Sequence, residues 1–231
     1  MEAQKVDTKH ISVPFLGVTD DANGIDAIAD RLRNTGRHPL AYAPWGDMYP
    51  SQASVQFAIA FGNDSLYLQY DVAEPTVQAL YGKNNEPVYQ DSCVEAFFSF
   101  DEGESYYNFE FNCIGTVLAA FGRSKSSREF LPDTVLQQLK SQSIVRKEGG
   151  VWVNWEFTVA IPYSAFLYHP VTSLKGQQWR ANFYKCGDNL PEPHFLCWSP
   201  IKSMEPNFHL PEFFGTLSFA SEAENLRDHK I

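Results

Sequence analysis

The chain lacks any apolar run long enough to cross a membrane. None of its hydrophobic stretches approaches the roughly 18 consecutive residues that a membrane-spanning helix requires. Residues 1–10 are polar and contain no hydrophobic segment of a secretory signal peptide. The sequence as written therefore predicts no membrane span and a cytoplasmic location, or a secreted or periplasmic one if the N-terminus has been processed.

The sequence also lacks the cysteine spacing of a zinc site. Its four cysteines form no C-x-x-C pair and have no suitably spaced histidine; they are Cys93, Cys113, Cys186 and Cys197. Three disulfide pairings are formally possible. Because 231 residues can bury a core that needs no cross-links, we expect free thiols that pack as small hydrophobic side chains.

Basic residues and interdomain linkers are scarce as well. The 18 lysines and arginines are outnumbered by 28 aspartates and glutamates, for a net charge of −10. Such an acidic surface repels phosphate backbones, so we expect no nucleic-acid partner. No internal repeat and no Pro/Gly/Ser-rich stretch divides the chain. We therefore predict one domain over residues 1–231.

What the sequence does contain is the alternation of apolar and polar residues that is typical of half-buried strands. It is most regular over 151–161, where every odd-numbered residue is apolar. Helical spacing over 25–32, between Asn23 as cap and Gly36 as end, predicts one helix, and a second follows Pro132. Alternation recurs over 55–61, 66–72, 94–100, 109–113, 117–121, 179–183 and 217–219.

So many strands with one apolar face predict an all-β fold, an antiparallel β-sandwich of jelly-roll or immunoglobulin-like type with one or two short helices. Within 151–161 we expect the odd residues, including Trp155, to be buried. Trp152, Asn154 and Glu156 should then lie on the opposite face, since one register cannot bury both sets.

The polar faces of these strands hold the candidate ligand-binding residues. Carboxylates, amides and an arginine form paired hydrogen bonds with sugar hydroxyls, and an aromatic ring packs on the C–H face of a pyranose. Arg180 is the cation that we expect to offset the carboxylates. Trp152 breaks the polar parity of its strand, either as a sugar platform or as a residue packed under a loop. The residues expected on one concave surface are Glu95, Glu110, Asn112, Arg180 and Asn182.

Four segments between residues 89 and 217 carry recognisable motifs. They are YQDSCVE at 89–95, NFEFN at 108–112 with Gly115 after it, WEFTVAIPY at 155–163, and the C-terminal series WSP at 198–200, FHLP at 208–211 and FFGTL at 213–217. In order and spacing they resemble the D-x-x-V-E strand, the central strand, the E-x-x-I-P strand end and the C-terminal signature of family 9 carbohydrate-binding modules, with their xylanase-associated, DOMON-like relatives.

This resemblance implies a non-catalytic, lectin-like module of polysaccharide degradation that holds the end of a sugar chain between two aromatic side chains. Tyr89, six residues before Glu95, stands where the family usually has a tryptophan. Phe208 or His209 would supply the second aromatic side chain. Glu110 occupies the position of a sugar-binding arginine. The expected ligand is a mono- or oligosaccharide, or the end of a polysaccharide.

We predict no cofactor and no catalytic or metal-binding residue. The family can carry calcium on loop carboxylates, for which Asp20-Asp21 and Asp101-Glu102 are the candidates, although no D-x-D-x-D run is present. The predicted ligand-binding residues are Tyr89, Glu95, Glu110, Asn112, Trp152, Arg180, Asn182, Phe208 and His209.

Three other functions are weighed against sugar binding. A glycoside hydrolase would use Glu95 and Glu110 as its carboxylate pair and would need a deep pocket with a desolvated acid. A structural or partner-binding sandwich would have lost the sugar site. A haem-binding relative would use methionine and histidine, but Met48 and Met204 have no histidine at a telling spacing.

Overall fold

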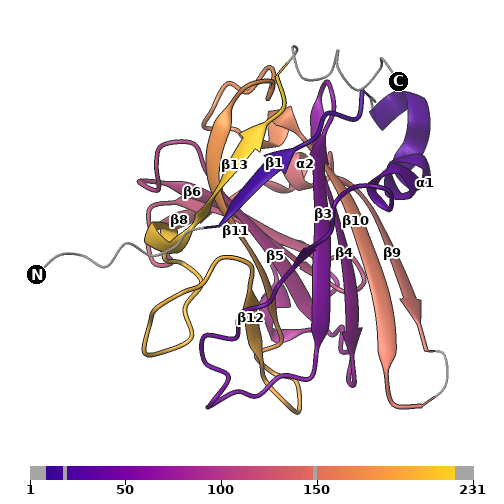
Figure 1. The fold of residues 1–231 in the computed structure, drawn as a ribbon, viewed down its shortest axis with the longest axis vertical. Coiled ribbons are helices and arrows are strands. Elements are labelled where there is room, and N and C mark those ends of the chain that lie inside the picture. The colour runs from indigo at the N-terminus through magenta and orange to yellow at the C-terminus, as the bar shows by residue number, and fades with distance from the viewer. Residues whose placement is uncertain (1–8, 18–19, 148–149, 222–231) are drawn as a thin grey trace, which may run out of the picture.

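A computed structural model describes residues 9–17, 20–147 and 150–221, with the backbone alone for residues 20–23. Two β-sheets pack face to face (Figure 1). The five-stranded sheet has the order β2-β3-β4-β10-β9. Its strands are β2 (His38–Pro39), β3 (Ser54–Phe61), β4 (Ser65–Glu74), β10 (Val153–Pro162) and β9 (Lys140–Arg146).

The larger sheet has eight strands in the order β1-β13-β11-β5-β6-β7-β8, with β12 also paired to β11. All of its pairings are antiparallel except that of β1 with β13. The strands are β1 (His10–Val13), β13 (Gly215–Phe219), β11 (Gln178–Cys186), β5 (Cys93–Ser99), β6 (Tyr106–Asn112), β7 (Val117–Gly122), β8 (Arg128–Phe130) and β12 (Phe195–Cys197). The predicted all-β sandwich is confirmed.

Two short α-helices and three 3₁₀ turns connect the strands. They are α1 (Asp20–Leu32), α2 (Asp133–Leu136), η1 (Val88–Gln90), η2 (Tyr163–Ala165) and η3 (Pro211–Phe213). The first helix is interrupted at Gly24, whose φ of 65° lies in the left-handed region. It ends at Leu32, earlier than the predicted end at Gly36, and the side chain of Asn23 lies outside the described residues.

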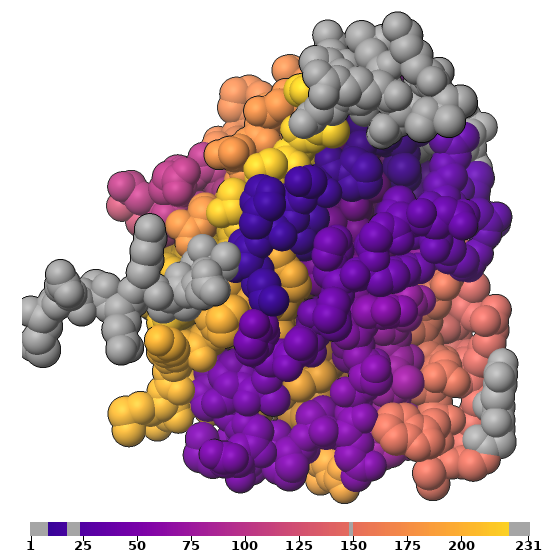
Figure 2. All heavy atoms as spheres, in the orientation of Figure 1, coloured from indigo at the N-terminus to yellow at the C-terminus, as the bar shows by residue number. Residues whose placement is uncertain are grey.

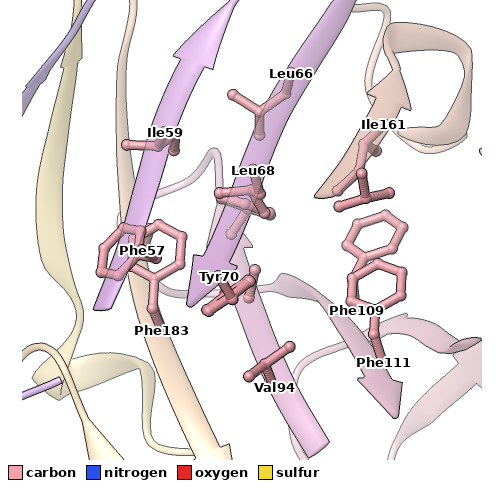
Figure 3. Close-up of a cluster of buried hydrophobic side chains, with 14 of the residues drawn as sticks. Phe57, Ile59, Leu66, Leu68, Tyr70, Val94, Phe109, Phe111, Ile161 and Phe183 are labelled. Carbon is pink, nitrogen blue, oxygen red and sulfur yellow. The ribbon is translucent and has the colours of Figure 1, made fainter. Parts of the chain in front are cut away.

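The inner faces of the two sheets form the main core. Phe57 of β3 and Phe183 of β11 meet across it with ring centroids 4.0 Å apart (Figure 3). Trp155 is buried and Asn154 is exposed, which confirms the register predicted for this strand. The regular strand begins at Val153, two residues later than the alternation indicates, and Val151 is exposed.

Both sheets are also covered on part of their outer faces. Ile28 and Leu32 of α1 pack on the outer face of the five-stranded sheet, where they bury Ala60 and Ala160. On the eight-stranded sheet, the covering segments are residues 42–49 and 195–214, which lie side by side on the surface (Figure 2). Trp45 therefore belongs to a second apolar cluster, outside the sandwich core.

The four cysteines are free and buried, as predicted: Cys93, Cys113, Cys186 and Cys197. Burial raises the pKa of the Cys93 thiol to about 12, so it is protonated at neutral pH. No helix in the described part of the chain is long and apolar enough to span a membrane.

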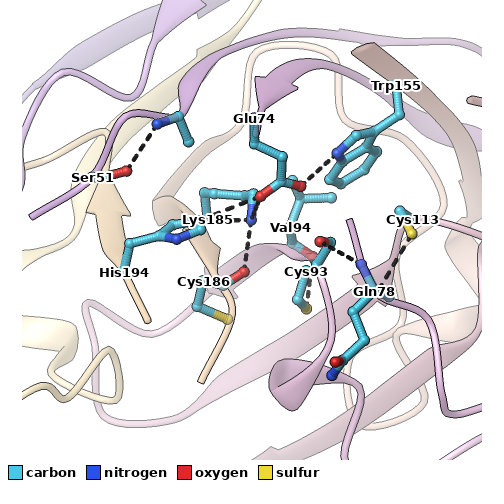
Figure 4. Close-up of polar contacts among 12 residues, drawn as sticks. Ser51, Glu74, Gln78, Cys93, Val94, Cys113, Trp155, Lys185, Cys186 and His194 are labelled. Atoms are coloured by element: carbon cyan, nitrogen blue, oxygen red, sulfur yellow. Dashed lines mark hydrogen bonds and ion pairs between the residues drawn. The ribbon is translucent and has the colours of Figure 1, made fainter. Parts of the chain in front are cut away.

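A buried ion pair joins the two sheets at one end of the sandwich (Figure 4). Lys185 Nζ of β11 lies 2.9 Å from Glu74 Oε2 of β4, and both side chains are fully buried. Trp155 Nε1 donates a hydrogen bond to Glu74 Oε1, and Lys185 donates to His194 Nε2. Burial, and after it the charge of Lys185, lowers the pKa of His194 to about 4, so its neutral ring accepts that bond.

We expect Lys185→Met to destabilise the fold by about 3–5 kcal/mol, because it leaves the Glu74 carboxylate buried without a cation. Urea unfolding at pH 7 would measure the loss. The matched double variant, Glu74→Gln with Lys185→Met, should recover most of it, since neither residue is then charged. A double variant as unstable as the single one would contradict this account.

Candidate functional site

Glu95 and Glu110 lie directly opposite each other on neighbouring strands of the eight-stranded sheet. The pairing of β5 with β6 places these two residues in register on the outer face. Cross-strand partners have Cβ atoms about 4.5–5.5 Å apart. Only 3% of Glu95 and 2% of Glu110 is exposed. Two carboxylates therefore sit side by side, almost completely removed from bulk water.

A pocket opens above this pair. Together with the open solvent at its mouth, it encloses about 440 Å³. It is formed where the covering segments meet the outer face of the sheet. Its lining residues are Tyr89, Glu95, Glu110, Lys125, Arg128, Cys186, Asp188, Phe195, Pro206, Asn207, Phe208 and His209.

Glu110 has one engaged and one unengaged carboxylate oxygen. Its Oε1 accepts hydrogen bonds from Arg128 at 3.2 Å and from Asn108 at 3.0 Å. Its Oε2 is buried without a hydrogen-bond partner among the described residues, and so is Asn108 Oδ1. Burial raises the pKa of Glu110 to about 7, although Arg128 opposes the shift.

Glu95 is held by a thiol. Cys186 Sγ donates to Glu95 Oε1 at 3.0 Å. Burial, and after it the charge of Glu110, raises the pKa of Glu95 well above its ordinary value. Because two adjacent carboxylates in an apolar setting repel each other, the pair retains a proton near neutral pH.

Arg128 and His209 line the pocket next to Glu110. Arg128 donates to His209 Nε2 at 3.2 Å, so that nitrogen carries no proton. Nδ1 then carries the proton and donates to the hydroxyl of Tyr106 at 2.9 Å. Burial, and after it the charge of Arg128, lowers the pKa of His209 to about 3. The ring is therefore neutral and fixed in one tautomer.

Aromatic side chains and a pair of opposite charges surround the floor. Phe208 stacks on Tyr184 with ring centroids 4.1 Å apart and an interplanar angle of 9°, which fixes its position. Tyr89 of η1 is half-buried. Burial raises the pKa of Asp188 to about 6 against the opposing charge of Lys125.

Arg128 reaches the pocket because β8 approaches β7 very closely. Gly122 pairs with Arg128 across the hairpin. A Cβ atom on Gly122 would lie 2.5 Å from Arg128 Cα and from Ser127 O, so a larger residue would have to push β8 away. The glycine thus positions the only guanidinium among the pocket's lining residues.

The structure brings five of the nine predicted residues together in this pocket: Tyr89, Glu95, Glu110, Phe208 and His209. Asn112 and Asn182, by contrast, bond the protein itself. Asn112 donates to Tyr81 O and to the carboxylate of Asp91, which in turn holds the backbone of the preceding loop. Asn182 exchanges two hydrogen bonds with the backbone of Ser199.

Arg180 and Trp152 lie elsewhere, which corrects the prediction of one surface for all nine residues. Arg180 donates to Phe214 O and faces Glu102. It is six positions along β11 from Cys186 of the pocket, roughly 20 Å away at about 3.3 Å per residue. Trp152, 39% exposed, precedes β10 of the other sheet. The alternation of residues shows which face of a strand a side chain lies on. It does not show how far along the strand the residue is from the pocket, or which of the two sheets the strand belongs to.

Seven further lining residues were not predicted from the sequence: Lys125, Arg128, Cys186, Asp188, Phe195, Pro206 and Asn207. Most of them lie in loops or in the short strands β8 and β12, where alternation is too brief to detect. Cys186 follows the parity of Asn182 on the same strand, so the alternation of β11 contained a signal for it.

One group in this region has the composition of a metal site. Donor atoms of Cys93, Glu95 and Cys186 lie within 4.8 Å of one another. Burial raises the thiol pKa values of both cysteines far above neutrality, so metal binding would have to displace protons. Among the calcium candidates, Asp101 already accepts bonds from Ser99 and Ser105, whereas the side chains of Asp20 and Asp21 lie outside the described residues.

The geometry differs from that of a hydrolytic carboxylate pair. In glycosidases the two carboxyl groups flank the scissile bond. Glu95 and Glu110 stand next to each other on one sheet face and both line the same pocket. A fixed pocket of carboxylates, a guanidinium and aromatic rings on a β-sandwich is typical of a carbohydrate-binding module.

The chain belongs to carbohydrate-binding family 9, whose model matches residues 28–219. It is therefore a non-catalytic binding module. A solved structure from Bacteroides uniformis, to which carbohydrate binding is ascribed, is 39% identical, with a TM-score of 0.84; the match covers 92% of this chain and 99% of that one. No curated protein sequence shows significant similarity to the chain.

Two further structures share the fold at low identity. Both are family 9 modules from Caldicellulosiruptor kristjanssonii, one in complex with glucose and one with cellotriose. The first is 14% identical with a TM-score of 0.63 and covers 93% of this chain and 97% of that one. The second is 13% identical with a TM-score of 0.63 and covers 94% and 96%.

The raised pKa of Glu110 predicts a loss of stability with rising pH. Between its ordinary value of 4.5 and about 7, the folded protein holds a proton that the unfolded chain releases. The free energy of unfolding should therefore fall across this window by up to about 3 kcal/mol from this group. Glu110→Gln should flatten the fall, as measured by urea unfolding at a series of pH values. Parallel curves for the two proteins would rule the effect out.

Proposed function

We propose that the pocket over Glu95 and Glu110 binds a monosaccharide or the end of an oligosaccharide. The observation that carries this proposal is Glu110 Oε2, a buried acceptor without a partner in the described structure, which faces a pocket with aromatic walls. Leaving such an atom unsatisfied costs about 1–3 kcal/mol, more if it is charged. A sugar hydroxyl that enters the pocket would satisfy it.

Five predicted residues have complementary roles in this proposal. The carboxylates of Glu95 and Glu110 accept hydrogen bonds from sugar hydroxyls. The rings of Tyr89 and Phe208 pack on the C–H faces of the pyranose, in the manner of aromatic platforms. His209, kept neutral and hydrogen-bonded to Tyr106, holds Arg128 in place beside Glu110.

The kind of sugar is proposed from the relatives. The two Caldicellulosiruptor modules were solved with glucose and with cellotriose, which supports hexoses or β-glucan ends as ligands. Association with xylan, expected from the sequence resemblance, would require affinity for xylo-oligosaccharides. A comparison of cello- and xylo-oligosaccharides of equal length distinguishes these two possibilities.

We expect Tyr89→Ala to weaken sugar binding by about 1–3 kcal/mol, the contribution of one packed aromatic ring. Isothermal titration calorimetry with glucose, cellotriose and xylotriose would measure it. Trp152→Ala serves as the matched control, because Trp152 is an exposed aromatic residue next to the start of β10 in the other sheet, and its loss should leave affinity unchanged. Unaltered binding by Tyr89→Ala would remove Tyr89 from the site, and no binding by the wild-type protein would favour a sandwich that has lost its sugar site.

A further inference from the structure

The charges that line the pocket do not balance. Its floor holds the carboxylates of Glu95 and Glu110 but a single guanidinium, that of Arg128. At the rim, Asp188 and Lys125 carry opposite charges and offset each other. With all five groups ionised, three carboxylates face two cations, and the excess negative charge lies on the buried floor.

The other polar groups of the lining do not correct this imbalance. His209 is neutral, because burial and Arg128 lower its pKa to about 3. Tyr89 and Cys186 are neutral as well, since their pKa values are raised above their ordinary values, chiefly by burial. Cys93, next to Cys186 beneath the floor, is a protonated thiol. An uncompensated negative charge in a buried site is unfavourable unless a cation or a proton joins it.

We propose that the pocket prefers a sugar that carries a protonated amine, an amino sugar whose ammonium group lies between Glu95 and Glu110. This inference rests on the proposed sugar-binding function and specifies the class of sugar. An ammonium group supplies the missing positive charge and three N–H donors at once, whereas a hydroxyl supplies one donor and no charge.

The unsatisfied atom of the floor is a carboxylate oxygen, which matches such a ligand. Glu110 Oε2 is buried and has no donor among the described residues. The available cation is already engaged, because Arg128 donates to Glu110 and to His209. An acidic sugar would therefore meet two carboxylates before a free guanidinium, and we expect uronic acids to bind least tightly.

In the empty pocket a proton takes the place of this cation. The pKa of Glu110 is raised to about 7 and that of Glu95 well above its ordinary value, so the pair is protonated near neutral pH. An ammonium group that enters between the two carboxylates displaces this proton into solvent. A neutral sugar carries no positive charge to replace this proton, so it should bind without proton release. Proton release on binding thus separates the two kinds of ligand by a measurement that is independent of affinity.

The experiment is calorimetry at pH 6.5 with glucosamine, galactosamine and mannosamine, each against its parent hexose and its N-acetyl derivative. Two buffers of different ionisation enthalpy report the protons released. We expect at least one amino sugar to bind about tenfold more tightly than both of its neutral counterparts, which corresponds to about 1.4 kcal/mol, with release of up to one proton. Glucuronic acid should bind more weakly than glucose.

Two carboxylate-to-amide variants provide the control. Glu110→Gln removes the excess charge and should reduce the ratio of the affinity for the amino sugar to that for the neutral sugar to about one. Glu129→Gln makes the same change on an exposed residue of β8 outside the pocket and should preserve the preference. If Glu110→Gln binds no sugar at all, proton release by the wild-type protein decides the question.

Two negative results would have different meanings. Neutral hexoses that bind as tightly as the amino sugars, or amino sugars that bind without proton release, would overturn this inference and leave the proposed sugar site standing. Absence of binding by every sugar would overturn both.

Discussion

The burial of the eight-stranded sheet on both of its faces is the constraint on which the site depends. Strands β5, β6 and β11 pack against the other sheet on one side and beneath residues 42–49 and 195–214 on the other. In a two-layer sandwich the outer face is normally solvated and tolerates charged residues at little cost. Here the covering segments remove Glu95 and Glu110 from bulk water. The electrostatics of the pocket follow from that removal.

Two sets of buried charged groups differ in how their carboxylates are neutralised. At the end of the sandwich, Glu74 Oε2 lies 2.9 Å from Lys185 Nζ and Glu74 Oε1 accepts a hydrogen bond from Trp155, so this carboxylate has a cation inside the fold. In the pocket, Arg128 pairs with Glu110 but not with Glu95 in the described structure, and Glu110 Oε2 has no hydrogen-bond partner there. The first arrangement links the two sheets. The second is open to a ligand.

Glu110 stands where the sequence resemblance implies a sugar-binding arginine, and Arg128 of β8 brings a guanidinium to the same pocket. Gly122 allows β8 to approach closely enough for Arg128 to reach Glu110.

The sequence by itself determined the sandwich and the location of the carboxylate pair. Alternation over residues 151–161 predicts the buried face of β10, because the side chains of a strand point to its two faces in turn. The motif that contains Glu95 likewise identifies the strand at the centre of the site. Such local patterns can be recognised without knowing which segments pack on the strand.

Only the tertiary structure decided which of the predicted polar residues line the pocket and which form hydrogen bonds within the protein. Asn112 and Asn182 share the parity of the pocket residues, yet both are used up by backbone groups of loops that arrive from elsewhere in the chain. Arg128 and Asp188 reach the pocket from loops and a three-residue strand. Their positions depend on contacts between segments far apart in sequence, and no local periodicity records such contacts.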